Sequence, residues 1–235
     1  MTHSSGEGSR QPADGLLAGL PVAVLGAGTM GTGIAQLLLQ AGADVTMVDP
    51  QADALTRARS QLNDTFEMLN AKGRIAATPR ALLARLATAT DVHAAAASRW
   101  IFEAAPERLA LKQELFQRVE EVAPGARLAT NTSTLSVTQI AAACQRPQNV
   151  VGVHFFNPAP LMKLVEVIPG LATPPAVVED ALAVTRALGR EPVVALDRPG
   201  FIVNRVARPY YGEALRLAGE GANYEELDAS LRAAG

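Results

Sequence analysis

Short apolar runs rich in β-branched residues alternate with alanine- and leucine-rich segments of helical period along most of this chain. The helical segments include residues 33–42, 53–73 and 108–123. The expected strands lie in PVAVLGAG, ADVTMVD, WIFEAAP, RLATNTS, VVGVHFF, KLVEVIP and PVVALD. Continuous apolar strands separated by helices are typical of a parallel sheet that is covered on both faces. We therefore predict an α/β fold with a doubly wound, mostly parallel sheet.

The alternation ends at Pro199-Gly200, a pair that interrupts both helices and strands, and the residues that follow have only helical character. We predict a flexible leader over residues 1–19, a sheet domain over 20–199, and the beginning of an all-helical second domain over 200–235. Two helices bury too little apolar surface to form a core alone. We therefore expect the given sequence to end inside its second domain.

Charge and composition exclude several classes of protein. The formal net charge is -2 and charges of both signs are interspersed, so we expect no basic stripe for nucleic acid. No apolar run approaches the ~20 residues of a membrane helix, and MTHSSGEGSRQPADG lacks the basic and apolar regions of a secretion signal. The single cysteine, Cys144, fits a reducing compartment and excludes a disulfide framework or a cysteine-rich metal site. We expect a soluble cytoplasmic protein.

The segment Gly26-Ala27-Gly28-Thr29-Met30-Gly31 follows an apolar run and opens a helical one. In this context Gly26 permits a tight turn, Gly28 lets the backbone approach a pyrophosphate, and Gly31 allows close helix packing. The helix start offers free N–H groups to phosphate. The next expected strand ends at Asp49, whose carboxylate would bind the adenosine ribose hydroxyls and repel a 2′-phosphate. The pattern predicts a Rossmann-type domain that binds NAD, with a plain strand-to-helix connection as the alternative.

Two titratable residues, His154 and Glu166, stand in successive apolar runs that are joined through Asn157-Pro158-Ala159-Pro160. If these runs are neighbouring strands, the two side chains can form a hydrogen bond. The carboxylate would then fix the tautomer of the imidazole and stabilise its charged form. Such a histidine can take a proton from a substrate hydroxyl as hydride leaves the same carbon for nicotinamide. We predict an acid–base pair here, against the alternative of a structural histidine in the core.

Four segments together, GAGTMGTGIA, ATNTSTLSVTQIA, VGVHFFNPAPLMKLVEVI and PGFIVNR, resemble the 3-hydroxyacyl-CoA dehydrogenase family in their order and spacing. The resemblance covers roughly residues 20–235 and is particularly clear to the bacterial 3-hydroxyadipyl-CoA and 3-hydroxybutyryl-CoA dehydrogenases. It implies NAD-dependent oxidation of an (S)-3-hydroxyacyl-CoA to the 3-oxoacyl-CoA. It also implies an acyl-CoA substrate and, for a full-length protein, a homodimer.

The resemblance also implies roles for individual residues. His154 would be the general base and Glu166 its partner, while Ser133 and Asn204 would hydrogen-bond the 3-oxygen of the substrate. Asn157 would lie beside the nicotinamide. Further residues are expected at the cofactor site: Glu107, Lys112 and Asn131. Coenzyme A is expected near Lys72 and Arg74. The alternatives are a turn for Ser133, a helix-start residue for Asn204, a solvated helix charge for Lys112, and an ordinary helix end around Lys72.

The second domain of this family continues for several more helices and closes over the acyl chain, so we expect the given sequence alone to bind NAD but to oxidise substrate poorly. Two other functions stay open. One is a hydroxy-acid dehydrogenase of the same superfamily that uses no coenzyme A. The other is a non-catalytic NAD-binding or structural relative, which would not require His154, Glu166, Ser133 and Asn204 together.

Overall fold

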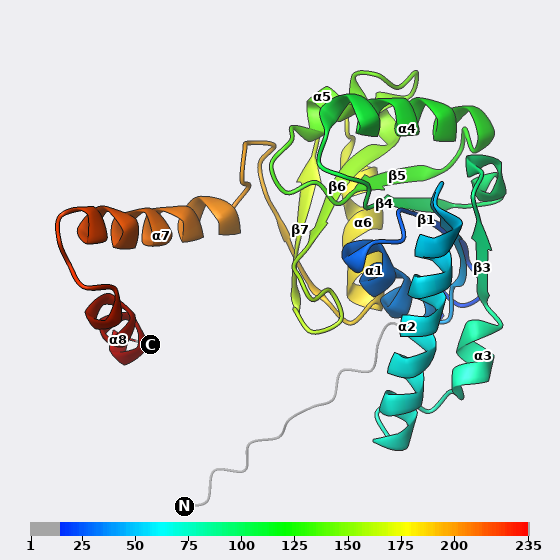
Figure 1. The fold of residues 1–235 in the computed structure, drawn as a ribbon. Helices are drawn as coiled ribbons and strands as arrows, with labels where there is room; N and C mark the ends of the chain where they lie inside the picture. Colours follow the sequence, from blue (N-terminus) through cyan, green and yellow to red (C-terminus); the bar gives the residue numbers. More distant parts are fainter. Residues whose placement is uncertain (1–14, 235) are drawn as a thin grey trace, which may run out of the picture.

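The apolar runs form a single eight-stranded sheet in the structure, a computed structural model that describes residues 15–234 (Figure 1). The strands are β1 Pro21–Leu25, β2 Asp44–Val48, β3 Leu86–Ala89, β4 Trp100–Glu103, β5 Arg127–Thr130, β6 Val150–Phe155, β7 Leu164–Pro169 and β8 Glu191–Val194. Their order across the sheet is β3-β2-β1-β4-β5-β6-β7-β8. Neighbours pair in parallel except β6 and β7, which are antiparallel. The predicted doubly wound, mostly parallel sheet is confirmed.

Helices cover both faces of the sheet, as the α/β prediction requires. The helices are α1 Thr29–Gln40, α2 Ala52–Ala71, α3 Pro79–Leu83, α4 Leu109–Val122, α5 Val137–Ala141, α6 Pro175–Ala187, α7 Val203–Gly219 and α8 Tyr224–Ala234, with short 3-10 turns at Val92–Ala95 (η1) and Pro147–Asn149 (η2). One buried apolar cluster joins the sheet to α1, α2 and α6, and a second joins it to α4 and α5. Both faces are therefore buried, which explains the apolar runs of the central strands.

One strand was not predicted. β3 lies at an edge of the sheet, pairs only with β2, and buries only Leu86 fully. Its residues LATA include no β-branched apolar side chain, so the sequence shows neither a continuous apolar run nor a clear alternation.

Residues 1–14 of the leader predicted over residues 1–19 lie outside the described residues. Residues 15–19 form turns, Leu17 is only 2% exposed in the core, and the N–H of Gly19 donates to the oxygen of Gly42 at 2.9 Å. The buried leucine holds this stretch against the sheet domain.

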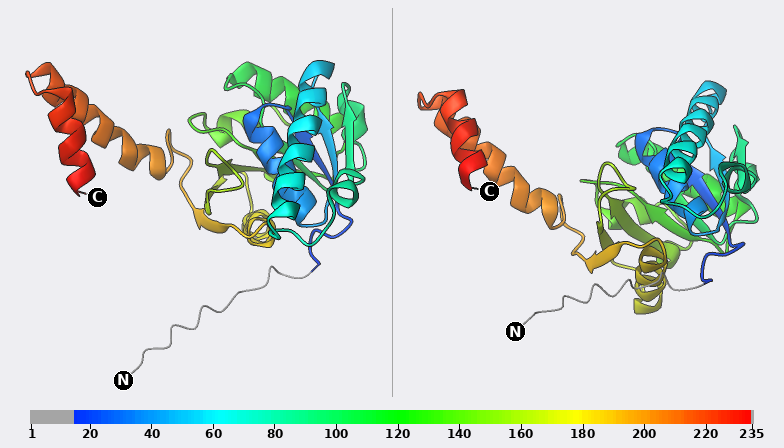
Figure 2. Two further views of the ribbon diagram at one scale, coloured as in Figure 1. Left: turned by 60° about the horizontal axis from the view of Figure 1, so that its bottom comes forward. Right: turned by 90° about the horizontal axis from the view of Figure 1, so that it is seen from below.

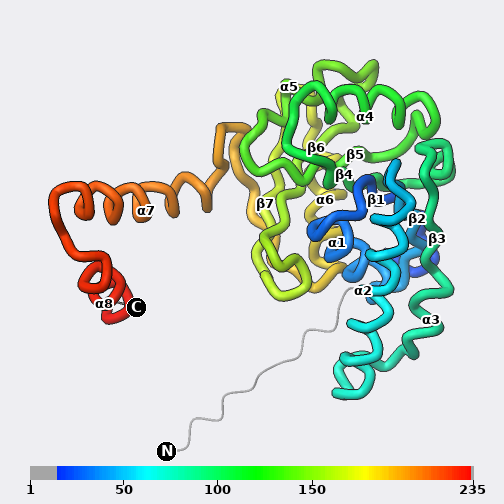
Figure 3. The backbone as a smooth tube through the Cα atoms, in the orientation of Figure 1, coloured from blue at the N-terminus to red at the C-terminus, as the bar shows by residue number. Residues whose placement is uncertain are grey.

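Beyond β8 the chain passes through residues 195–202 and then forms α7 and α8, which extend away from the sheet (Figures 2 and 3). Gly200 and Phe201 have positive φ angles of 80° and 47° just before α7 begins. No residue of α7 is buried. The domain boundary near residue 200 stays a prediction. None of the helices in residues 15–234 is long and apolar enough to cross a membrane.

Candidate active site

The glycine loop between β1 and α1 has the backbone geometry that the sequence predicts. Gly26 has φ 102°, and a Cβ added there would lie 2.7 Å from the oxygen of Ala104. A Cβ on Gly31 would lie 1.9 Å from the oxygen of Gly26, so the helix packs too closely for any side chain. Gly28 is different, because an added Cβ meets no atom within 4 Å. The space in front of Gly28 faces the start of α1 at Thr29, where the first N–H groups lack acceptors inside the helix.

Asp49 lies directly after β2 and is joined to the glycine loop. Its Oδ2 accepts a hydrogen bond from the N–H of Ala27 at 2.9 Å, and its Oδ1 accepts one from the N–H of Gln51 at 2.9 Å. A carboxylate has about four lone-pair sites, so two remain for hydroxyl donors. The order of the sheet reverses between β1 and β4, and ligands of doubly wound folds bind at such a switch point. The residues therefore fit a dinucleotide.

A cavity of about 450 Å³ lies next to this loop, beyond the carboxyl ends of β4, β5 and β6. It brings together eight of the residues predicted from the sequence: Met30, Glu107, Lys112, Asn131, Ser133, His154, Asn157 and Asn204. The cavity is also lined by residues that the sequence analysis did not identify: Ala104, Ala105, Thr134, Phe155, Phe156 and Arg208. Six other predicted residues are not part of its lining: Gly26, Gly28, Thr29, Gly31, Asp49 and Glu166.

His154 and Glu166 face each other across the antiparallel β6–β7 pair, which confirms that their strands are neighbours. Nδ1 of His154 lies 2.8 Å from Oε2 of Glu166, and the Glu166 side chain is 0% exposed. An ionised carboxylate only accepts hydrogen bonds, so Nδ1 carries the proton and Nε2 keeps a free lone pair. The rings of Phe156 and Phe201 pack around the imidazole, with centroids at 4.5 Å and 5.7 Å. The arrangement presents an oriented base to the cavity.

The second oxygen of Glu166 binds the start of α7. Oε1 accepts hydrogen bonds from the N–H groups of Ile202 and Val203, both at 2.9 Å. Nearby, Nδ2 of Asn204 donates to the backbone oxygen of Ser133 at 3.3 Å. One buried carboxylate therefore holds both the imidazole and the first turn of the helix that carries Asn204.

A second buried ion pair lies at the end of β4. Nζ of Lys112 lies 2.7 Å from Oε1 of Glu103, and the two side chains are 1% and 0% exposed. Glu103 also accepts hydrogen bonds from the N–H of Ala105 at 2.6 Å and from Oγ1 of Thr130 at 2.7 Å. Lys112 is therefore not a solvated helix charge. Sequence reasoning missed Glu103, although a glutamate inside the apolar run WIFE was a visible signal.

Glu107 connects this ion pair to the loop after β5. Its Oε2 lies 3.4 Å from Nζ of Lys112, and its Oε1 accepts from Oγ1 of Thr132 and the N–H groups of Ser133 and Thr134, at 2.6, 2.8 and 3.0 Å. Burial alone would raise the pKa of Glu107, but the hydrogen bonds from Thr132 and Ser133 and the charge of Lys112 lower it to about 2. Glu107 therefore stays ionised and fixes the Ser133 loop.

Three other predicted residues, Asn131, Lys72 and Arg74, have clear places in the structure. Oδ1 of Asn131 accepts a hydrogen bond from the N–H of Phe155 at 2.9 Å, which joins the end of β5 to β6. Lys72 and Arg74 are exposed at the C-terminal end of α2 and do not line the cavity.

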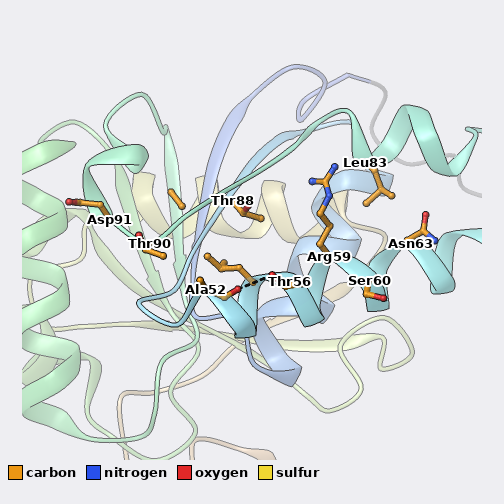
Figure 4. Close-up of a pocket in the computed structure, with 11 residues that line it drawn as sticks. Ala52, Thr56, Arg59, Ser60, Asn63, Leu83, Thr88, Thr90 and Asp91 are labelled. Atoms are coloured by element: carbon orange, nitrogen blue, oxygen red, sulfur yellow. Dashed lines mark hydrogen bonds between the residues drawn. The ribbon is translucent and has the colours of Figure 1, made fainter.

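A larger groove of about 880 Å³ lies elsewhere, between α2, α3 and the edge strand β3 (Figure 4). It is lined mainly by short polar side chains, and Arg59 beside it donates from Nη1 to the oxygen of Leu86 at 3.1 Å. None of the predicted site residues lines this groove. The smaller cavity is therefore the candidate site, because it contains the paired base.

Comparison with known proteins identifies the family. Residues 21–198 match the family described as 3-hydroxyacyl-CoA dehydrogenase, NAD binding domain, and residues 200–235 match the corresponding C-terminal domain. The 3-hydroxyadipyl-CoA dehydrogenase of Escherichia coli (strain K12) is 49% identical over 214 residues, which cover 90% of this chain and 45% of the relative. The chain thus spans less than half the length of that relative.

Solved structures are also similar to this chain. A crystal structure of 3-hydroxybutyryl-CoA dehydrogenase from Escherichia coli K12 superposes with a TM-score of 0.84 at 47% identity, covering 88% of this chain and 44% of that chain. A second similar structure is 5-formyl-3-hydroxy-2-methylpyridine 4-carboxylic acid 5-dehydrogenase, an NAD+-dependent dismutase. It has a TM-score of 0.81 at 30% identity, covering 90% of this chain and 69% of that chain.

Proposed function

Because the chain belongs to the 3-hydroxyacyl-CoA dehydrogenase family, we propose that it oxidises the 3-hydroxyl group of an (S)-3-hydroxyacyl-CoA to a 3-oxo group with NAD. The observation that carries the proposal is the buried His154–Glu166 pair, which presents an oriented base to a cavity beside a dinucleotide-type glycine loop. Oxidation of an alcohol needs both a proton acceptor and a hydride acceptor. The paired base and the glycine loop that would hold the hydride acceptor lie side by side here.

In the proposed reaction, Nε2 of His154 takes the hydroxyl proton of the substrate. Glu166 keeps Nδ1 protonated and stabilises the imidazolium that forms, because its Oε2 accepts the Nδ1 hydrogen bond. NAD, when bound, supplies the acceptor for the hydride that leaves the same carbon. Ser133 and Asn204 hydrogen-bond the 3-oxygen, and their own contact across the cavity wall keeps them together.

In this proposal, NAD binds along the glycine loop and the cavity wall nearest to it. Gly26, Gly28, Thr29, Met30 and Gly31 form the pyrophosphate site, in which Gly28 leaves the open space. The ribose binds Asp49, and the nicotinamide side is lined by Glu107, Lys112, Asn131 and Asn157. The carboxylate of Asp49 favours NAD over NADP, because it repels a 2′-phosphate.

The division of the chain and the assembly of the whole protein are also part of the proposal. Residues 20–199 form the NAD-binding domain, and residues 200–235 belong to a helical domain for substrate binding and dimerisation. The whole protein is then a cytoplasmic homodimer that acts on acyl-CoA in fatty-acid or phenylacetate degradation. The names of similar proteins support the acyl-CoA substrate, and the unburied helices α7 and α8 support a helical surface that another part of the protein or a second subunit would cover.

A second candidate is oxidation of a hydroxy acid without coenzyme A, which the likeness to the pyridine carboxylic acid dehydrogenase favours. The test is NADH formation with 3-hydroxybutyryl-CoA, 3-hydroxyadipyl-CoA and free 3-hydroxybutyrate. Turnover of a coenzyme A ester but not of the free acid is the expected result. Turnover of the free acid alone would establish the second candidate. NAD binding without turnover by this chain, but with turnover by a longer chain that includes the further helices of the second domain, would show that those helices are required. NAD binding without turnover by either chain would favour a non-catalytic relative.

A further inference from the structure

The charged residues of the cavity leave one positive charge without a partner. The ammonium of Lys112 is bound by Glu103 and lies 3.4 Å from Glu107, which is itself ionised. The other permanent cation in the lining is Arg208 on α7, and no ion pair within residues 15–234 includes it. By contrast, Arg216 on the same helix pairs with both Glu213 and Glu220. The cavity therefore offers a free guanidinium to an anionic group.

The position of Arg208 is set by the helix. Arg208 follows Asn204 by four residues, so the two side chains lie on the same face of α7 with their Cα atoms about 6 Å apart along the axis. Asn204 is fixed at the reacting end of the cavity, because its amide reaches the backbone oxygen of Ser133. Arg208 is therefore one helical turn beyond the place where the 3-oxygen of the substrate is held.

The length of the substrate selects which anion can reach this position. In a six-carbon dicarboxylic acyl group, the terminal carboxyl carbon is separated from C3 by bonds that span about 4 Å. The phosphates of coenzyme A lie beyond the pantetheine arm, roughly 15–20 Å from the thioester when that arm is extended. A guanidinium binds a carboxylate through two parallel hydrogen bonds, which suits recognition of a chain end.

We propose that Arg208 binds a carboxylate at the far end of the acyl chain and makes 3-hydroxydicarboxylyl-CoA esters, such as 3-hydroxyadipyl-CoA, the preferred substrates of this site. The inference rests on the proposed function, since it assigns the substrate class of the same cavity. Arg208 is in this account a specificity-determining residue. It has no role in the transfer of the proton.

The first test is a binding measurement that needs no turnover. The saturated esters adipyl-CoA and butyryl-CoA are titrated in the presence of NAD into the wild-type chain and into Arg208→Gln. The wild type should bind adipyl-CoA about 10- to 10²-fold more tightly than butyryl-CoA, as expected for a hydrogen-bonded charge pair. In Arg208→Gln this preference should disappear, and the affinity for butyryl-CoA and for NAD should be unchanged. Arg208→Lys keeps the positive charge but loses the two parallel N–H donors of the guanidinium. This variant should retain part of the preference.

Arg216→Gln is the matched control, because Arg216 lies on the same helix outside the cavity, and it should keep the wild-type preference. Equal weakening of both esters in Arg208→Gln would overturn the proposal and place Arg208 at the phosphates of coenzyme A. Weaker NAD binding would overturn it and place Arg208 at the cofactor. Absence of any preference in the wild type would overturn it as well.

The second test is kinetic. The ratio of kcat/KM for 3-hydroxyadipyl-CoA over 3-hydroxybutyryl-CoA should fall about 10- to 10²-fold in Arg208→Gln, with the butyryl ester scarcely affected. An unchanged ratio would contradict the proposal. A wild type that binds adipyl-CoA preferentially but turns over neither ester, also in a longer chain that includes the further helices of the second domain, would contradict the proposed function while leaving the role of Arg208 intact.

Discussion

Glu103 and Glu166 are both fully buried carboxylates in the same sheet, and each has a nitrogen partner, at 2.7 Å for Glu103 and 2.8 Å for Glu166. Their partners differ. Both side chains border the cavity, but Nζ of Lys112 lies among two carboxylates and the backbone oxygen of Ala105, whereas Nε2 of His154 has no hydrogen-bond partner within residues 15–234. The donors of the Lys112 ammonium are therefore engaged, whereas the imidazole nitrogen that faces the cavity can accept a proton from a substrate. The first pair is a fixed charge pair, and the second can change its charge during a reaction.

The remaining contacts of the two glutamates also differ: those of Glu103 are structural, and those of Glu166 reach the helix that borders the cavity. Glu103 binds the backbone of Ala105 and the hydroxyl of Thr130, so it joins parts of one rigid sheet. Glu166 binds the N–H groups of Ile202 and Val203, so it joins the sheet to a helix that extends from it. We expect changes at Glu103 to affect mainly stability and changes at Glu166 to affect mainly turnover.

Glu166→Gln should have the largest effect on turnover. The N–H groups of Ile202 and Val203 hold the carbonyl oxygen of the new amide, so its NH2 group faces Nδ1 of His154. That donor stabilises the tautomer with the proton on Nε2, which cannot act as a base. We expect kcat to fall about 10²- to 10⁴-fold, as for loss of a general base, with the domain still folded. Glu191→Gln, on the exposed start of β8, is the control. Turnover near the wild-type value in Glu166→Gln would show that Glu166 does not set the tautomer of His154 for the reaction.

Lys112→Met should have the largest effect on stability. The substitution leaves the buried carboxylate of Glu103 without its counter-charge, which costs about 3–5 kcal/mol in the free energy of unfolding. Adding Glu103→Gln removes the isolated charge and should restore most of that loss. Urea unfolding of the single and double variants measures both effects. If the single variant were as stable as the wild type, the fixed charge pair would have no energetic importance.

Glu107 should give a smaller, pH-dependent effect. Its pKa is lowered from 4.5 to about 2 in the folded chain, so its contribution to stability is present above about pH 4.5 and is lost as the pH falls toward 2. The shift corresponds to at most about 3 kcal/mol, and solvent screening reduces this because the side chain is 35% exposed. Between pH 5 and 3, the unfolding free energy of the wild type should decrease more steeply than that of Glu107→Gln. Parallel pH curves for the two chains would show that Glu107 does not stabilise the Ser133 loop.

The sequence predicted the strands that are buried on both faces, because such burial requires a run of apolar residues. It failed to predict the edge strand β3, whose burial is only partial. Residues 85–88 and 127–130 are both Arg-Leu-Ala-Thr. The second copy is β5 in the middle of the sheet, and the first lies largely in the edge strand β3, which was not predicted. The same four residues thus have different neighbours, and position in the sheet is a tertiary property that a local pattern does not carry.

The candidate site shows the same limit. The glycine loop and the His154–Glu166 pair were predictable, because their spacing along two apolar runs fixes their contact once the strands pair. Glu103 was overlooked inside an apolar run, since its partner Lys112 lies on a helix whose orientation the sequence does not give. Arg208 was not identified, because only the path of α7 from the sheet brings it to the cavity.

The central claim, that His154 is the base of an NAD-dependent oxidation, is tested most directly by His154→Ala. NADH formation with a 3-hydroxyacyl-CoA ester and NAD binding should be measured on the same preparations. Turnover should fall about 10²- to 10⁴-fold, while the affinity for NAD stays at the wild-type value. Near-normal turnover in His154→Ala would contradict the account.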